Sequence, residues 1–264
     1  MIYLSIATTG IDPNKNRIYL INILENGRYR GLWGDPKTHR EEILSLGNKE
    51  IITFNGEGFD LTFIAKKTDI QLTSFDMYRY LKGNKFYEGA TSTKEWAKKL
   101  DLEDLPSVHR RLKVFKEYEQ SGKGKEQLLQ WGEQDIRLRQ EIHKNIESWR
   151  KKYRRPLGEG FAELYSYRKR KDFFTFLYQG EEIPKIDLGF HPWEAKGEGE
   201  KLEIRFPVVE GYIAPGEKGK CIAYPLGDDG LVEDLQIIEK QGQMQKKKIQ
   251  TIGLDLLHQI GLFL

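Results

Sequence analysis

The chain has 264 residues, of which 38% are hydrophobic and 31% are charged, and its formal net charge is +3. This composition excludes a largely disordered protein, and the near balance of charge permits a nucleic-acid partner without requiring one. The single cysteine, Cys221, excludes an intramolecular disulfide and a thiolate zinc cluster. No apolar run approaches the roughly 20 residues of a membrane-spanning helix, so we expect no membrane partner and a cytoplasmic protein.

The first part of the chain begins with predicted strands. Residues 2–7 (IYLSIA) and 17–24 (RIYLINIL) are short runs rich in Ile and Tyr, and the turn formers of TTGIDPNKN join them. This pattern predicts a hairpin, with a third strand near 28–33. A further strand is expected at 51–54, and helices are expected at 38–46, 61–67, 74–81, 93–100 and 125–149. Early strands, later helices and one strand after a helix predict an α/β fold with a sheet of antiparallel and parallel strands.

The composition changes near residues 148–160 (SWRKKYRRPLGEG), where a basic stretch is followed by a proline and two glycines. Such a segment is typical of a domain boundary, and we expect domains at 1–150 and 156–264. Beyond the boundary, the segments predicted as strands are 161–179, 201–209 and 220–226, and 249–264 is predicted as an amphipathic helix. The second domain is therefore expected to be a smaller α+β domain, and no motif in it indicates its role.

Three segments of the first part resemble, in order and spacing, the motifs of the DEDD family of ribonuclease H-like 3′–5′ exonucleases. They are LSIATTG at 4–10, ITFNGEGFD at 52–60 and WGEQD at 131–135, and the resemblance covers roughly residues 1–147. The pieces TTG, NG..FDL and FDMYRYL look most like the bacterial YprB-type subgroup. The resemblance implies a ribonuclease H-like mixed sheet with flanking helices.

Members of that family bind two divalent cations, Mg²⁺ or Mn²⁺, with an Asp and a Glu two residues apart on the first strand and one Asp from each later motif. Matching residue by residue places the later acids at Asp60 and Asp135, which are the retained catalytic candidates. The first-motif pair falls on Ser5 and Ala7, so both carboxylates are missing. The family's general base falls on Trp131, whose indole N–H cannot accept a proton. Asp60 and Asp135 would hold one ion weakly, or none.

These departures predict an exonuclease-family protein that is catalytically impaired and binds nucleic acid. Natural loss of the acids and deliberate replacement would leave the same residues. One alternative is therefore an active Mg²⁺-dependent 3′–5′ exonuclease whose parent carries Asp at position 5 and Glu at position 7. Another alternative is a protein-interaction module built on a nuclease scaffold.

Candidate contacts to nucleic acid come from the retained motifs and from two basic clusters, RKKYRR and RKRK, which could track a phosphate backbone. A solvated surface is the alternative interpretation of each cluster. The sequence does not distinguish DNA from RNA. The candidates are Thr8, Asn55, Arg154, Arg155, Arg168 and Arg170.

Overall fold

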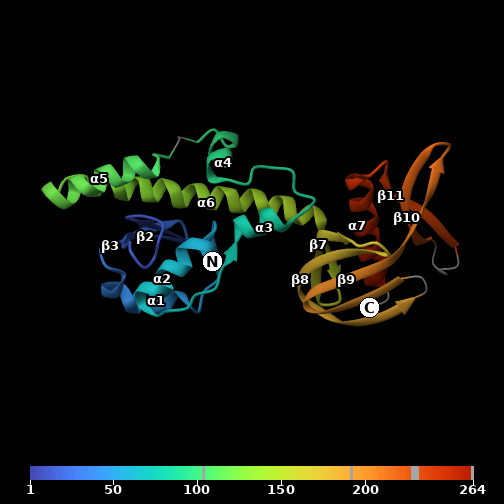
Figure 1. Ribbon diagram of the computed structural model, residues 1–264. Coiled ribbons are helices and arrows are strands. Elements are labelled where there is room, and N and C mark those ends of the chain that lie inside the picture. Colours follow the sequence, from blue (N-terminus) through green and yellow to red (C-terminus); the bar gives the residue numbers. More distant parts are fainter. Residues whose placement is uncertain (103–104, 191–192, 227–231, 263–264) are drawn as a thin grey trace. The chain divides into compact units, whose positions relative to one another are not determined.

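The computed structural model of the protein describes residues 1–102, 105–190, 193–226 and 232–262 (Figure 1). The chain divides into two compact units, of which one comprises Met1–Lys82 and Gly89–Glu147 and the other comprises Gly83–Glu88 and Ser148–Leu264. Among the described residues, no helix is both long and apolar enough to cross a lipid bilayer. The expected cytoplasmic location stays a prediction.

The first unit is built on a mixed five-stranded sheet with the strand order β3-β2-β1-β4-β5. Strand β2 is antiparallel to both β1 and β3, whereas β4 is parallel to β1 and β5 is parallel to β4. The strands are β1 (Ile2–Thr8), β2 (Ile18–Glu25), β3 (Arg28–Trp33), β4 (Ile51–Thr53) and β5 (Phe75–Asp76). The predicted hairpin, its third strand and the mixed α/β sheet are thereby confirmed.

Helices flank this sheet. They are a 3-10 segment (Pro36–His39), α1 (Arg40–Leu46), a π-helical turn (Gly56–Asp60), α2 (Leu61–Thr68), α3 (Met77–Gly83), α4 (Thr93–Lys99), α5 (Val108–Ser121) and α6 (Lys125–Tyr153). The prediction of a helix over 74–81 is wrong at its start, because Phe75 and Asp76 pair with β4 as strand β5. The Asp76 carboxylate then accepts the backbone N–H of Tyr78 at 3.0 Å and caps α3.

Alternation along β1 separates the two faces of the sheet. The side chains at positions 2, 4 and 6 enter the apolar core that α1 and α2 cover. Tyr3, Ser5 and Ala7 lie on the opposite face, where the Tyr3 hydroxyl is 3.1 Å from Nδ1 of His143 on α6. The first-motif positions therefore face the helix that carries Asp135.

The second unit contains a seven-stranded antiparallel sheet in which strands that follow one another in sequence also pair, in the order β12-β11-β10-β9-β8-β7-β6. The predicted strand character of 161–179 is confirmed, and this segment forms two strands, β7 and the first part of β8, which pair as a hairpin. The strands are β6 (Arg154–Leu157), β7 (Gly160–Lys169), β8 (Phe173–Phe190), β9 (Trp193–Ala214), β10 (Glu217–Leu226), β11 (Val232–Lys240) and β12 (Gln243–Met244).

Helix α7 (Lys246–Leu262) buries an apolar stripe against this sheet. A Cβ at Gly253 would lie 2.8 Å from Cδ2 of Leu164, so glycine at this position lets the helix approach β7 closely. The Tyr178 hydroxyl donates to the Gly253 carbonyl at 2.8 Å. The predicted terminal helix is confirmed with an earlier start, and residues 263–264 of that prediction lie outside the described residues.

Candidate functional site

The two retained acids of the motifs meet beside β1 in the first unit. Oδ1 of Asp60 accepts the backbone N–H of Ile6 at 3.1 Å, and Asp135 lies on α6, above the same strand. Both side chains are buried. The two acids, which the motif comparison selected on separate segments, therefore converge with β1 at one buried place, here called the cleft.

The loop before Asp60 is fixed by local constraints. Asn55 has a φ of 62°, in the left-handed region that Asn tolerates better than most residues. A Cβ at Gly56 would lie 2.2 Å from Oγ1 of Thr53, so this position requires glycine. The Asp76 carboxylate accepts the backbone N–H groups of Asn55 at 2.8 Å and Glu57 at 3.1 Å. The NG pair of the second motif thus shapes the turn that delivers Asp60 to the cleft.

Arg139 of α6 joins the two acids. Its Nη1 donates to Oδ2 of Asp60 at 3.1 Å, and its Nε donates to Oδ2 of Asp135 at 3.2 Å. Nη1 also lies 3.4 Å from the carbonyl oxygen of Leu4 on β1. All three charged side chains are buried, so a single guanidinium compensates both carboxylates where water has little access.

Burial and the charges of the cluster shift the pKa values of Asp60 and Arg139. Burial raises the pKa of Asp60 from its ordinary value of 3.8 to about 6, against the opposing effects of the Arg139 charge and hydrogen bonds. For Arg139, burial favours the neutral form, but the Asp135 and Asp60 carboxylates outweigh it and raise the pKa of the guanidinium. At neutral pH, Asp60 is therefore ionised and Arg139 is a permanent cation.

The space beside Ser5 is filled by an amide. Nδ2 of Asn22 on β2 donates to the Ser5 hydroxyl oxygen at 3.1 Å, and the Tyr29 hydroxyl donates to Oδ1 of Asn22 at 3.0 Å. A Cβ at Gly132 would lie 2.1 Å from that Oδ1, so the glycine of the third motif lets α6 pass over Asn22. Ser5 thus takes part in a neutral hydrogen-bond chain.

Ala7 and Trp131 lie in apolar surroundings. Both pack against a buried cluster that includes Tyr19 and Phe115, whose rings stack with centroids 4.1 Å apart. The Arg110 guanidinium lies over the Trp131 ring, 5.5 Å from its centroid. Phe115 and Arg110 belong to α5, a helix that the sequence did not predict. Ala7 and Trp131 therefore contribute to the packing of this helix.

The remaining candidates are distributed over both units. In the first unit, the Thr8 hydroxyl donates to the Gly10 carbonyl at 2.6 Å within the turn after β1. In the second unit, Arg154 lies 3.9 Å from Glu163 and 3.8 Å from the Phe161 ring centroid. Arg155 donates to two backbone carbonyls, at 3.1 and 2.9 Å.

Arg168 and Arg170, also in the second unit, are exposed. Among the described residues, neither has a carboxylate within ion-pair distance.

The residues of the cleft do not fit the pair of divalent cations that the motif resemblance implies. Ala7 offers no donor, Ser5 offers only a neutral hydroxyl, and both carboxylates already contact Arg139. Three nearby acids are also engaged: Glu57 with Arg79, Glu133 with Arg137, and Asp76 with backbone N–H groups. Among the described residues, no group of three or more His, Cys, Asp or Glu side chains is arranged to hold a metal ion.

Sequence reasoning missed Arg139 and Asn22. The signal for Arg139 is its position four residues after Asp135, on the same helical stripe as Ile142 and Ile146, which are both buried. An oppositely charged pair on a buried helical stripe is unusual, and each member is expected to neutralise the charge of the other. Asn22 lies opposite Ser5 in the β1–β2 register, so alternation places its amide on the same face of the sheet as Ser5 and away from Ile21 and Ile23.

This architecture, a mixed sheet with flanking helices and acids converging beside its first strand, defines a ribonuclease H-like domain. The sequence profile of the RNase_H superfamily matches residues 2–146, and the chain belongs to this superfamily. No curated protein matches the chain. The expected assignment to the YprB-type subgroup stays a prediction.

Solved structures similar to this chain include nucleases. The apo form of a nuclease has 15% sequence identity and a TM-score of 0.41, and the match covers 56% of this chain and 71% of that chain. NrnC of Brucella melitensis bound to pGG has 17% identity and a TM-score of 0.35, and the match covers 56% of this chain and 85% of that chain. The same protein with bound Mg²⁺ has 17% identity and a TM-score of 0.34, and the match covers 56% of this chain and 86% of that chain.

Proposed function

We propose that this protein is a member of the RNase_H superfamily that binds nucleic acid and is impaired in metal-dependent cleavage. The observation that carries the proposal is Arg139, which contacts the two carboxylates that the motifs retain. With Ser5 and Ala7 at the other two positions, the cleft has an internal cation in place of a set of anionic ligands. The family's scaffold is kept, while the chemistry of its site is changed.

Electrostatics explains why Arg139 opposes metal binding. A divalent cation at Asp60 and Asp135 would have to displace a guanidinium that is covalently tethered and hydrogen-bonded to both. The displaced Arg139 would then be a buried charge without a partner, which is strongly unfavourable. The two-metal mechanism also needs anionic ligands that offset two closely spaced cations, and Asp60 and Asp135 alone do not supply them.

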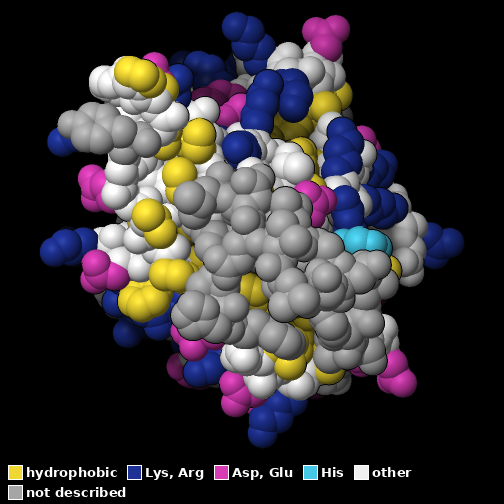
Figure 2. Space-filling model, turned by 90° about the vertical axis from the view of Figure 1, so that its right-hand side faces the viewer, with side chains coloured by type: hydrophobic (Ala, Val, Ile, Leu, Met, Phe, Trp, Pro, Cys, Tyr) yellow, Lys and Arg dark blue, Asp and Glu magenta, His cyan; other side chains and the backbone are white. Residues whose placement is uncertain are grey.

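Exposed cations support binding to nucleic acid. Arg168, on β7, and Arg170, in the turn after it, present guanidinium groups that carboxylates do not neutralise among the described residues. Figure 2 shows Lys and Arg side chains gathered along the upper right of one face, with isolated Asp and Glu side chains among them. Guanidinium groups bind phosphate oxygens in a bidentate manner, so this chemistry suits a nucleic-acid backbone. We include Thr8, Asn55, Arg154 and Arg155 in the proposed contacts as secondary members.

A gel-shift titration tests the binding part of the proposal. We expect wild-type protein to bind single-stranded DNA or RNA with an affinity that falls as salt rises. The double variant Arg168→Gln/Arg170→Gln should show a salt slope shallower by about 0.7 for each phosphate group that the protein no longer neutralises. The control Lys185→Gln/Lys201→Gln removes the same charge from exposed positions of the same unit and should leave the slope unchanged.

Absence of binding to either polymer would overturn the nucleic-acid function and favour a protein-interaction module. Parallel titrations with DNA and RNA of the same sequence also decide which polymer is preferred. The 2′-hydroxyl is the chemical difference that a protein can use to distinguish them.

A cleavage assay tests the impairment. With Mg²⁺ or Mn²⁺, the wild-type protein should leave labelled oligonucleotides intact, and Ser5→Asp/Ala7→Glu should also be inactive because Arg139 still holds the other two acids. Only the further addition of Arg139→Gln could open the site. Degradation by the wild-type protein that is lost in Asp60→Asn would overturn the proposal and favour an active exonuclease.

A further inference from the structure

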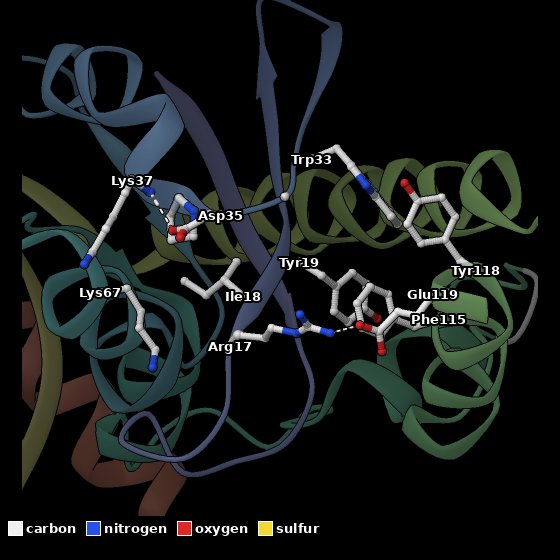
Figure 3. A pocket seen from close by; sticks show the side chains of 12 residues that line it. Arg17, Ile18, Tyr19, Trp33, Asp35, Lys37, Lys67, Phe115, Tyr118 and Glu119 are labelled. Atoms are coloured by element: carbon white, nitrogen blue, oxygen red, sulfur yellow. Dashed lines mark hydrogen bonds and ion pairs between the residues drawn. The ribbon is translucent and has the colours of Figure 1, made fainter. Parts of the chain in front are cut away.

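The first unit contains a cavity of about 410 Å³ that is separate from the Arg139 cluster. It is lined by the start of β2, the segment after β3, the end of α2 and the last turns of α5 (Figure 3). Small-molecule pockets in proteins typically measure about 300–1,000 Å³, so the cavity can hold a compact ligand. Its lining combines aromatic walls with charged ends, which restricts the chemistry of that ligand.

The walls of the cavity are apolar and aromatic. Tyr19 and Phe115 form a stacked pair, and Trp33 meets Tyr118 edge to face with ring centroids 4.8 Å apart. Ile18 completes this surface. Planar groups such as a nucleobase gain van der Waals contact with such walls.

Two lysines stand at one end of the cavity. In Figure 3, the ammonium groups of Lys37 and Lys67 lie on one side, and the rings of Trp33 and Tyr118 lie on the other. Among the described residues, no carboxylate lies within ion-pair distance of either ammonium group. Arg17, by contrast, pairs with Glu119 at the cavity's edge. The two lysines are therefore the cations of this cavity that remain available to a ligand.

The backbone around Lys37 is fixed in advance. The Asp35 carboxylate accepts the backbone N–H of Lys37 at 2.9 Å, and the Gly34 N–H donates to the Tyr19 carbonyl at 2.9 Å. These bonds hold the segment after β3 against β2 and present the Lys37 side chain to the cavity. A preformed site of this kind loses less entropy when it binds a ligand.

We propose that this cavity binds a nucleoside monophosphate unit, with the base against the aromatic walls and the phosphate between Lys37 and Lys67. Two ammonium groups without an ion-pair partner among the described residues match a doubly charged phosphomonoester better than a single carboxylate, although the Asp35 carboxylate also lines the cavity. The inference goes beyond the proposed function, because neither the cleft acids nor Arg168 and Arg170 take part in this cavity. The unit can come from a free nucleotide or from a nucleotide within a single strand, since both present the same chemistry.

Isothermal titration calorimetry with nucleoside monophosphates, the matching nucleosides and a short single-stranded oligonucleotide tests the proposal. We expect the monophosphates or the oligonucleotide to bind, and the nucleosides to bind at least about tenfold more weakly. The variant Lys37→Gln/Lys67→Gln should weaken binding by a similar factor. The control Lys66→Gln/Lys98→Gln removes the same charge from exposed residues that do not line the cavity and should bind like wild type.

Binding of free monophosphates that depends on Lys37 and Lys67 identifies a free nucleotide as a ligand. If only the oligonucleotide binds, and its binding depends on Lys37 and Lys67, the ligand is a nucleotide within a single strand. If neither ligand binds, or if Lys37→Gln/Lys67→Gln binds as tightly as wild type, the proposal is overturned. The variant Arg168→Gln/Arg170→Gln should not change monophosphate binding, so failure of this proposal is distinguishable from failure of the proposed nucleic-acid function.

Discussion

Each unit of the protein buries carboxylates against arginines, but in different proportions. In the first unit, Asp60 and Asp135 share Arg139. In the second unit, the fully buried Glu163 is contacted by Arg150 at 2.8 Å and by Arg154 at 3.9 Å. Among the contacts of the described residues, the first cluster has two anions for one cation, and the second has two cations around one anion.

The two clusters also differ in the exposure of their arginines. The side chains of Arg150 and Arg154 are 16% and 26% exposed, so water reaches them, whereas that of Arg139 is 11% exposed and both of its partners are buried. The arginine cluster around Glu163 is an ordinary anchor for the end of α6. The cluster around Arg139 has a surplus of anions, so it depends more strongly on its single guanidinium.

Removal of Arg139 should give the largest effect. The variant Arg139→Leu leaves two buried carboxylates without compensation, and we expect a loss of about 3–5 kcal/mol in the free energy of unfolding. Urea denaturation measures this change. The control Arg137→Leu breaks an exposed pair with Glu133 two residues away and should cost less than about 1 kcal/mol. Equal losses in both variants would contradict a special role for Arg139.

The pH dependence of stability should report Asp60. Because its pKa rises from 3.8 to about 6 on folding, the folded protein binds this proton more tightly than the unfolded chain does. The Asp60 contribution to stability is therefore fully present below pH 3.8 and is lost as the pH rises to about 6, by up to roughly 3 kcal/mol. Unfolding free energies of wild type and Asp60→Asn across this range measure it. The wild-type value minus the variant value should fall with rising pH, and a rise would contradict the prediction.

Substitution in the cluster around Glu163 should lower the free energy of unfolding less than substitution of Arg139. The variant Glu163→Gln keeps an acceptor for the Arg150 hydrogen bond and leaves arginines that partly reach water, so we expect a loss of about 1–3 kcal/mol. Chemical denaturation provides the measurement, with Glu194→Gln as a control at the half-exposed pair with Arg205. A loss as large as that of Arg139→Leu would remove the contrast between the two clusters.

Much of the fold could be predicted from local patterns. Apolar runs joined by turn formers indicated the hairpin of β1 and β2, and the ordered motifs located Asp60 and Asp135. Strand β5 was missed because it has two residues, and their extended backbone depends on pairing with β4. Helix α5 was missed because most of its surface is polar, and only Phe115 among its residues is buried.

The character of the site could not be predicted in the same way. An arginine on a long charged helix usually indicates a solvated face, and the burial of Arg139 follows from β1, the π-helical turn and α6 meeting at one place. The motif resemblance predicted that metal ligands are missing at Ser5 and Ala7. It did not show that Arg139 contacts Asp60, because this contact joins segments 79 residues apart in the chain.

A Mn²⁺ titration followed by the electron paramagnetic resonance signal of the free ion tests the central claim, that Arg139 keeps divalent cations out of the cleft. Wild-type protein should leave the signal of free Mn²⁺ unchanged, whereas Arg139→Gln, which releases Asp60 and Asp135, should take up about one ion per chain. Saturable uptake by the wild-type protein that disappears in Asp60→Asn would contradict the claim.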